Sequence, residues 1–325
     1  MGRVLVVGTT GQLGTATIRK LQARGASIRA LTRSPERSAH FAQAGIELAL
    51  GDLTDRESLI RACAGISAVL ATANAAVPSR PSDTFEAVDR QGYRNLIEAA
   101  QRGRVKRFIY TSALISKYQH LSPLLQSKRD TEELLAASGL DHALFRAGVF
   151  MDVAFAMVGS TIPIRNSEAA TVLRPFAFGN RHFERIKDSI PEKHTAMIPG
   201  DGTIRHGFIC IEDVAEFLAA AAFSGPSGIL TLGGLEALTF VDVVRLFERL
   251  LGISLRIKRT PAIVFRLAAA IMQPFSPAGA NLMALNYIAA VEDSPADDGA
   301  AAAFGIRLTS AEAFLRAKYA MAECL

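Results

Sequence analysis

The chain has 325 residues, half of which are hydrophobic, so it can bury a large core in one α/β unit or in two lobes that share a cleft. The net charge of +5 comes from 36 basic and 31 acidic side chains spread along the sequence, which argues against a dense basic face for nucleic acid. A signal peptide and an apolar run of about 18 residues are both lacking, so we expect a cytoplasmic protein rather than a secreted or membrane-spanning one.

Short β-branched runs alternate with longer runs of helical apolar spacing through the first 150 residues. Strands are predicted at 3–8, 26–33, 46–52, 66–73, 105–112 and 140–148. Helices are predicted at 12–25, 34–45, 55–65, 82–103 and 127–139. Strands that alternate with helices of ten or more residues are typical of a doubly wound parallel sheet covered on both faces. We therefore expect an α/β fold, with one such domain over 1–151.

The alternation breaks after Met151, and residues 153–198 follow no regular period. Strands are predicted again at 228–234 and 255–260, and a strand followed by a helix over 205–223. Further helices are predicted at 239–252, at 261–272 and at the end of 304–320, and a loop at 292–303. We expect 152–325 to return strands to the sheet and to form a smaller C-terminal substrate-binding lobe.

The most apolar segment spans residues 261–275 and is interrupted by Arg266. Prolines stand at its start and near its end, and the segment is too short to cross a bilayer. We favour a buried or interface helix here over a helix on a membrane surface, and therefore expect no membrane contact.

The cysteines are few and widely spaced. Cys63, Cys210 and Cys324 are an odd number and show no spacing typical of metal ligands. We interpret them as reduced thiols of a cytosolic protein and predict no metal site.

The stretch GTTGQLG, from Gly8 to Gly14, joins the first predicted strand to the first predicted helix. Glycines at every third position allow a tight turn, close approach of a ligand to the backbone, and close packing of the helix on the strand. Backbone N–H groups at the helix start would point at a pyrophosphate, which the helix dipole also favours. No Gly-Lys-Ser/Thr follows the turn, which argues against a P-loop. We predict that the dinucleotide is bound by Gly8, Thr10, Gly11, Gln12, Leu13 and Gly14.

The end of the second predicted strand distinguishes the two nicotinamide cofactors. A carboxylate there would bind the ribose 2′-hydroxyl of NAD, but this strand ends in ALTRSPER, with Arg33 at the expected place. A guanidinium can bind a 2′-phosphate through two hydrogen bonds, so we expect NADP(H) and regard NAD(H) as the less favoured cofactor. Asp52 and Leu53 are expected beside the adenine, and Thr72 and Asn74 beside the ribose nearest the nicotinamide.

Several segments together resemble a known group. GTTGQLG, LTRSPER, GDLTD, VKRFIYTSA, the lysine in SKRDTEELLAASG and FICIEDVAEFL resemble the atypical short-chain dehydrogenase/reductases, above all the NmrA-like branch. That branch includes isoflavone reductase-like enzymes, photosystem II assembly factors of plastids and cyanobacteria, and NmrA nitrogen regulators. The resemblance implies an NAD(P)-binding Rossmann domain with a small substrate lobe. It also implies that the segment after the sixth strand lines the nicotinamide, where Phe150 would pack; a place in the core is an equal alternative.

Ordinary members of the superfamily carry Tyr-x-x-x-Lys on one helix, where the lysine lowers the pKa of a proton-transferring tyrosine. Here Leu124 stands four residues before Lys128, so the motif is incomplete. The resemblance implies that Lys128 contacts the cofactor ribose and serves in proton transfer. We name two further catalytic candidates, Ser112 at the end of the fifth strand and Tyr118 in a loop.

Two functions of different classes stay open. The leading hypothesis is an NADPH-dependent oxidoreductase that transfers hydride to a small, mainly apolar carbonyl or enone-type substrate. It rests on the cofactor motifs, Lys128 and the apolar C-terminal half. The alternative is a regulatory or assembly factor that binds NADP(H) without turnover, because Tyr-x-x-x-Lys is missing. A homodimer is left open, and a nucleic-acid partner is not expected.

Overall fold

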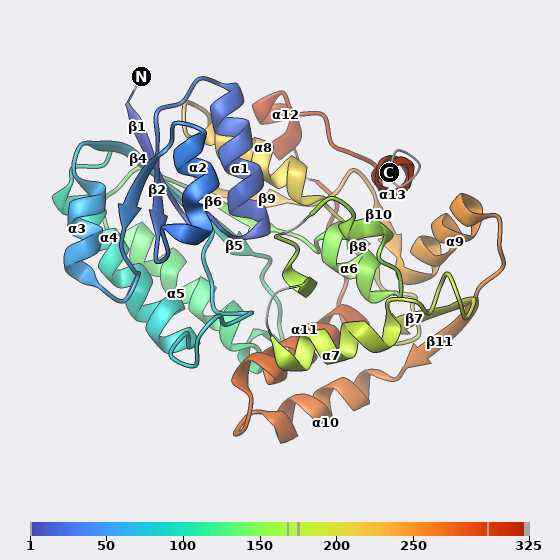
Figure 1. Cartoon of the computed structure of the whole chain (residues 1–325). Coiled ribbons are helices and arrows are strands. Elements are labelled where there is room, and N and C mark those ends of the chain that lie inside the picture. The colour runs from blue at the N-terminus through green and yellow to red at the C-terminus, as the bar shows by residue number, and fades with distance from the viewer. Residues whose placement is uncertain (1, 168, 174–175, 298, 322–325) are drawn as a thin grey trace.

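The computed structural model describes residues 2–167, 169–173, 176–297 and 299–321. Its centre is a seven-stranded parallel sheet in the order β3-β2-β1-β4-β5-β6-β9 (Figure 1). The strands are β1 (Arg3–Val7), β2 (Ile28–Thr32), β3 (Glu47–Leu50), β4 (Ile66–Ala71), β5 (Arg107–Ala113), β6 (His142–Ala147) and β9 (Gly228–Leu232). The predicted doubly wound α/β fold is confirmed. Its strand order reverses between β1 and β4, the place where such sheets bind ligands.

Helices cover both faces of this sheet. One face carries α1 (Gln12–Ala23), α2 (Ala39–Gln43) and α8 (Ile211–Ala221), and the other carries α3 (Arg56–Cys63), α4 (Gly92–Arg102) and α5 (Pro123–Ala137). Because successive strand residues point to opposite faces, Val4 and Val6 pack beneath the first set, whereas Leu5 and Val7 pack beneath the second. The sheet therefore lies between two apolar layers, and the loops of the site follow the strands that these layers hold in place.

The second half of the chain contributes β9 and α8 to this unit and builds a smaller unit beside it (Figure 1). Two short sheets pair β7 (Thr195–Pro199) with β11 (Arg256–Thr260), and β8 (Arg205–Gly207) with β10 (Ala237–Thr239). The helices are α6 (Met151–Met157), α7 (Ala177–Ile186), α9 (Phe240–Leu251), α10 (Ala262–Met272), α11 (Pro277–Val291), α12 (Ala300–Phe304) and α13 (Ala311–Ala320). Phe155, Phe208, Phe247 and Phe314 meet in the core of the smaller unit.

Several predicted elements differ from the structure. The helix predicted over 82–103 begins as a π-helical turn, Phe85–Gln91, and that predicted over 34–45 is divided into a 3₁₀ turn, Glu36–Ser38, and α2. The helix predicted from residue 127 begins at Pro123, because a serine just before it caps its first turn. The predicted loop 292–303 ends in α12, because its alanines favour a helix once Asp297 accepts hydrogen bonds from the N–H groups that begin it.

Cys63 and Cys210 are buried free thiols, whereas Cys324 lies outside the described residues. Within the described ranges, no helix is both long enough and apolar enough to span a bilayer.

Candidate functional site

The glycine-rich turn brings backbone close to backbone at the carboxyl end of β1. Gly8 has a φ of +94°, and a Cβ there would lie 2.7 Å from the backbone nitrogen of Ala73. A Cβ on Gly14 would overlap the carbonyl oxygen of Gly8. A Cβ on Gly11 would meet a single described atom within 4 Å, the Gly8 oxygen at 3.2 Å. Gly8 and Gly14 therefore shape the turn, whereas Gly11 leaves its outer side open for a ligand.

The N-terminus of α1 suits a negatively charged ligand. Gly11 is the N-cap, no side chain of the described residues caps this helix end, and its first turn carries no acidic residue. Two hydroxyl groups fix the chain beside it: Thr9 Oγ1 donates to the Leu31 carbonyl at 3.1 Å, and Thr15 Oγ1 donates to the Thr9 carbonyl at 3.0 Å. The helix start, with its positive dipole end, therefore fits the pyrophosphate of a dinucleotide.

Gln12 and Leu13 connect the turn to the second half of the chain. Gln12 Nε2 lies 3.5 Å from Asp152 Oδ1, and Asp152 Oδ2 accepts the N–H of Ile211, the first residue of α8, at 2.9 Å. Leu13 packs in the apolar cluster that contains Ile211. Burial raises the pKa of Asp152 to about 6. This carboxyl thus joins the cofactor turn to α8.

Arg33 lies directly after β2 and is paired with two carboxylates. Its Nη1 and Nη2 donate to the two oxygens of Asp83 at 2.6 and 3.1 Å, and Asp52 Oδ2 lies 3.5 Å from Nη1. The hydrogen bond with Asp83 raises the pKa of Arg33. Burial acts to raise the pKa of Asp83, but Arg33 holds it below its usual value. Arg33 stands where the sequence predicts it, and Asp83 engages both of its terminal nitrogens.

The other predicted cofactor residues lie at the carboxyl ends of β3 and β4. Asp52 Oδ1 accepts two hydrogen bonds within its own turn, and Leu53 is buried in the core below it. Thr72 Oγ1 donates to the Val7 carbonyl at 3.2 Å, so this side chain ties β4 to β1 beside the glycine turn. Asn74 Oδ1 accepts a backbone N–H two residues further on. The residues predicted to contact the adenosine and the ribose therefore lie together at the carboxyl ends of the strands.

Lys128 points from α5 into the interior. The residue is 5% exposed, and its Nζ donates to the carbonyl of Thr111 at 2.8 Å. The amine also lies 4.6 Å from the centre of the Tyr110 ring and 5.8 Å from that of Tyr93. Burial lowers the pKa of Lys128 to about 8, although the charge of Asp89 opposes this shift. In this arrangement the amine lies beneath the ends of β4 and β5.

Asp89 completes a buried polar cluster around Lys128. Its Oδ2 accepts the N–H of Ala75 at 2.8 Å, which holds the loop after β4. Its Oδ1 and the hydroxyl of Thr111 lack a hydrogen-bond partner among the described residues. Burial raises the pKa of Asp89 to about 6, although Lys128 acts to lower it. The π-helical turn that the sequence did not predict is the element that places Asp89 here.

Ser112 is engaged in an ion-pair network. Its hydroxyl lies 2.5 Å from Glu132 Oε1 and accepts a hydrogen bond from Arg129 Nη2 at 3.0 Å. Glu132 also accepts from Arg146 Nη2 at 2.6 Å. The serine is 3% exposed, so its hydroxyl is held between α5 and β6.

Tyr118 and Phe150 lie apart from this network. The Tyr118 ring meets the ring of Tyr287 on α11 edge-on, with 5.2 Å between centres. Phe150, directly before α6, is half-buried and packs against a cluster formed by Ala16 of α1 and by Ile211 and Ala215 of α8. The structure thus brings the glycine turn and the ends of β2, β3 and β4 together, while Lys128, Ser112 and Tyr118 have separate partners.

A comparison with known families decides the assignment. A family model described as NAD(P)H-binding matches residues 8–170, half of the chain, and this range includes the glycine turn, Arg33 and Lys128. The chain belongs to the NAD(P)H-binding family. The assignment to the atypical short-chain, NmrA-like group is confirmed, and NAD(P)H is its cofactor.

Curated relatives of this NAD(P)H-binding chain extend over most of its length. It is 27% identical over 268 residues to a photosystem II assembly factor of Cyanophora paradoxa, covering 82% of this chain and 74% of that protein. It is 30% identical over 252 residues to sterol demethylase protein B of Methylococcus capsulatus, covering 76% and 74%.

Solved structures show the same fold. An NADPH-dependent quinone oxidoreductase from Escherichia coli, crystallised with NADPH, aligns with a TM-score of 0.72 at 21% identity, covering 97% of this chain and 99% of that one. A triphenylmethane reductase from Citrobacter, crystallised with NADP(H), aligns with a TM-score of 0.71 at 20% identity, covering 97% and 99%.

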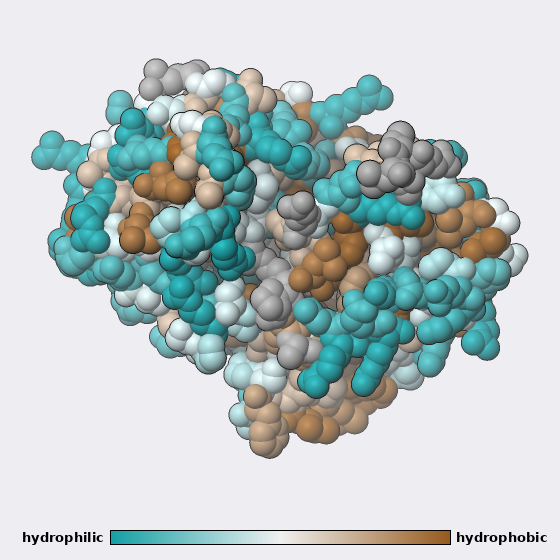
Figure 2. All heavy atoms as spheres, in the orientation of Figure 1, coloured by the Kyte–Doolittle hydropathy of each residue, from teal (hydrophilic) through white to brown (hydrophobic). Residues whose placement is uncertain are grey.

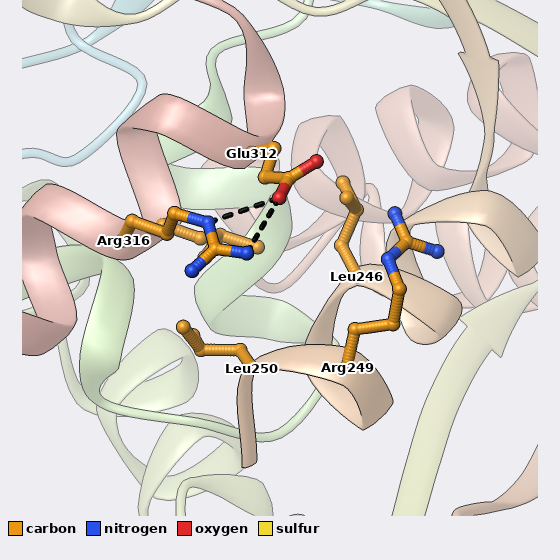
Figure 3. Close-up of a pocket in the computed structure, with 6 residues that line it drawn as sticks. Leu246, Arg249, Leu250, Glu312 and Arg316 are labelled. Atoms are coloured by element: carbon orange, nitrogen blue, oxygen red, sulfur yellow. Dashed lines mark hydrogen bonds and ion pairs between the residues drawn. The ribbon is translucent and has the colours of Figure 1, made fainter. Parts of the chain in front are cut away.

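A shallow pocket between α9 and α13 is separate from the NAD(P)H-binding turn (Figure 3). Its lining residues are Leu246, Arg249, Leu250, Glu312, Leu315 and Arg316. Glu312 accepts two hydrogen bonds from Arg316, at 2.8 and 2.9 Å, so the charged groups beside the pocket are already paired. None of the predicted site residues lines it.

Asp83, Asp89 and Asp152 are the functional candidates that sequence reasoning missed. Asp83 stands at the start of the helix predicted over 82–103, where it resembles an ordinary helix cap. Asp89 falls inside a predicted helix, and Asp152 follows a strand. No local pattern distinguishes them, because each acts on residues at least 14 positions away.

Proposed function

We propose that this chain is an NADP(H)-binding assembly or regulatory factor rather than an enzyme that turns over a substrate. The observation that carries the proposal is that two of the three catalytic candidates, Lys128 and Ser112, are held by partners within the chain. Lys128 donates to a backbone carbonyl in the interior, Ser112 is held by Glu132, and Leu124 stands where the superfamily has its tyrosine. The photosystem II assembly factors that match four fifths of the chain support the same function.

In this function the cofactor acts as a structural ligand. The backbone from Gly8 to Gly14 would hold the pyrophosphate, and the loops after β2, β3 and β4 would hold the two nucleoside parts. NADPH supplies a transferable hydride when bound, but the ligand role needs only its binding energy. Binding would fix three loops at once and thereby favour one conformation of the surface offered to a partner protein.

The preference for NADP(H) over NAD(H) rests on Arg33. Its guanidinium lies at the end of β2 and carries a permanent positive charge, which suits a 2′-phosphate. Asp52 Oδ2 lies 3.5 Å from Arg33 Nη1, and this carboxylate would face the adenine. The pairing of Arg33 with Asp83 orients the guanidinium before the cofactor arrives.

A reductase is the second candidate, because burial lowers the pKa of Lys128 to about 8. A lysine with that pKa can exchange a proton near neutral pH. In this case NADPH would reduce a small, mainly apolar carbonyl or enone, with Lys128, Ser112 and Tyr118 as the catalytic candidates. The solved reductases of the same fold make such an activity a natural comparison.

The first test separates binding from turnover. At 100 times its Kd, NADPH should raise the free energy of unfolding by about 2.7 kcal/mol. The nicotinamide absorbance should stay constant when carbonyls, enones and quinones are added. Gly11→Val fills the open side of the turn, so NADPH should no longer stabilise this variant. The unliganded circular dichroism and melting temperature of this variant are measured beside it, because a Cβ at this position would lie 3.2 Å from the Gly8 carbonyl oxygen, closer than an ordinary contact.

Oxidation of NADPH by any member of that panel would contradict the ligand role and favour the reductase. Lys128→Met, which keeps the length of the side chain and removes its charge, then tests the lysine. A fall of about 100-fold or more in kcat/KM with unchanged NADPH binding assigns it proton transfer. A loss of NADPH binding assigns it a cofactor-holding role instead.

A further inference from the structure

Helix α10 turns its large apolar side chains outward. Figure 2 shows brown, hydrophobic atoms gathered at the lower end of the molecule, where Figure 1 places α10. The exposed fractions are 53% for Ile263, 47% for Val264, 56% for Leu267, 69% for Ile271 and, just after the helix, 86% for Phe275. Ile263, Leu267, Ile271 and Phe275 are four residues apart, so they form one continuous stripe.

The inner side of the same helix carries alanines together with two larger apolar residues. α10 packs on α11 through three alanines and two larger residues, and none of its residues is fully buried. The half-buried residues are Ala262, Phe265, Ala268, Ala269 and Met272. An ordinary surface helix has polar residues on its outer side, whereas most of the large apolar residues of α10 lie there. A single exposed leucine or isoleucine needs no explanation, but a contiguous stripe of four with Val264 beside it indicates an interaction surface.

The charges around the stripe identify the kind of surface that covers it. Between Glu248 and Glu292 the sequence contains five basic residues and no acidic residue. Arg256 and Lys258 are exposed on β11, directly before α10, and Arg266 is exposed on the helix itself, 5.9 Å from the centre of the Tyr287 ring. An apolar stripe flanked along the chain by basic residues is complementary to an anionic lipid surface.

We propose that α10 and the basic residues of β11 form a peripheral docking surface for an anionic bilayer. The helix would lie in the plane of the interface, with the stripe inserted among the acyl chains and Arg256, Lys258 and Arg266 at the headgroups. At 11 residues, α10 is about 16 Å long, which suits a helix lying on a bilayer and not one crossing it. This proposal is independent of the cofactor function. The expectation was a buried or interface helix; no residue of α10 is fully buried, so the buried helix is wrong, and the proposal replaces the interface with a lipid surface.

Vesicle sedimentation tests the proposal with the full chain. We expect binding to vesicles of phosphatidylcholine and phosphatidylglycerol, and at least tenfold weaker binding to phosphatidylcholine alone or in high salt. Leu267→Ser/Ile271→Ser/Phe275→Ser should abolish binding. Arg256→Gln/Lys258→Gln should weaken it about 25-fold, at about 1 kcal/mol for each basic residue. Ile229→Ser removes a similarly exposed isoleucine on β9 and should leave binding unchanged.

Three results would overturn the proposal. The first is a chain that stays in the supernatant with both kinds of vesicle. The second is binding that survives the triple serine substitution in a variant with the parental circular dichroism and melting temperature. The third is a dimer, seen by sedimentation velocity without lipid and abolished by the triple variant, with no vesicle binding, because a second copy then covers the stripe.

Discussion

Arg33 shows how one side chain can serve two partners. Its terminal nitrogens both face Asp83, so a 2′-phosphate must compete with that carboxylate or approach the guanidinium from another edge. The carboxylate thus orients the arginine and also weakens its net attraction for an anion. Asp83 is therefore a candidate for tuning the preference between NADPH and NADH.

We predict opposite effects for the two partners of this pair. Arg33→Ala should weaken NADPH binding about tenfold or more and change NADH binding much less, because only NADPH carries the 2′-phosphate. Asp83→Asn keeps an oxygen for the N–H groups of Ser79 and Arg80 and should strengthen NADPH binding. Fluorescence titration with NADPH and with NADH measures the two dissociation constants and hence their ratio. An equal loss of affinity for both cofactors in Arg33→Ala would show that Arg33 does not bind the 2′-phosphate.

Two buried carboxyls give the stability a particular pH dependence. The pKa values of Asp89 and Asp152 are raised from 3.8 to about 6, so between about pH 4 and 6 the folded chain binds more protons than the unfolded chain. The free energy of unfolding contributed by these groups is therefore fully present below pH 4 and is lost as the pH rises through 6. Lys128, with its pKa lowered to about 8, makes stability rise between pH 8 and 10.5.

Asp89→Asn should remove part of the fall in the free energy of unfolding between pH 4 and 6. The amide keeps an oxygen for the Ala75 N–H and does not ionise, so the loss across this window should shrink by about 2 kcal/mol. Asp152→Asn should have a similar and independent effect. Urea unfolding at several pH values measures both. A slope in Asp89→Asn equal to that of the parent chain would contradict the assignment of this titration.

At the scale of elements, the start of α5 is coupled to α11. Ser122 Oγ accepts the N–H of Leu125 and lies 2.7 Å from Asn281 Oδ1, which also accepts the N–H of Leu124 at 3.2 Å. Ser122 and Asn281 are both buried. This joint connects the helix that carries Lys128 to the helix beneath α10.

Asn281→Ala should lower the free energy of unfolding by about 2–3 kcal/mol, because it leaves two buried donors without an acceptor. Ser310 caps α13 in a more exposed place, and Ser310→Ala is the matched control, with an expected cost of about 0.5–1 kcal/mol. Chemical unfolding measures both variants. Equal costs would show that the joint contributes nothing beyond an ordinary cap.

At the scale of the whole molecule, the two halves of the sequence share one core. β9 pairs with β6 at the edge of the sheet, and α8 packs along α1. The apolar layer on that face mixes Val4, Val6 and Ile18 from the first half with Phe217 and Leu232 from the second. Residue 151 therefore marks a change in the sequence pattern, but residues from both sides of it pack in one core.

We predict that a fragment of residues 1–151 does not fold on its own. It exposes the edge of β6 and the apolar face that α8 covers, and it loses Asp152, which joins Gln12 to α8. Circular dichroism should show no cooperative thermal transition, and NADPH should not stabilise the fragment, in contrast to the full chain. A cooperative transition with NADPH binding would make these residues an independent domain.

The sequence alone determined the parts that depend on local pattern. Strand and helix periods predicted the sheet, and the glycine spacing placed the cofactor turn, because a turn of this kind needs glycine at fixed neighbouring positions. Arg33 was found by the same reasoning, since its place follows from where one strand ends. Helix ends were less accurate, because caps such as Ser122 decide them.

Only the tertiary structure decided which groups are free to act. Lys128 faces a carbonyl of β5, Ser112 is held by Glu132, and Asp83 reaches Arg33 across 50 positions of sequence. It also decided that α10 turns its large side chains outward, which the composition of that segment did not indicate. The physical reason is that charge pairing and burial depend on packing between distant segments, whereas period and turn geometry depend on neighbours along the chain.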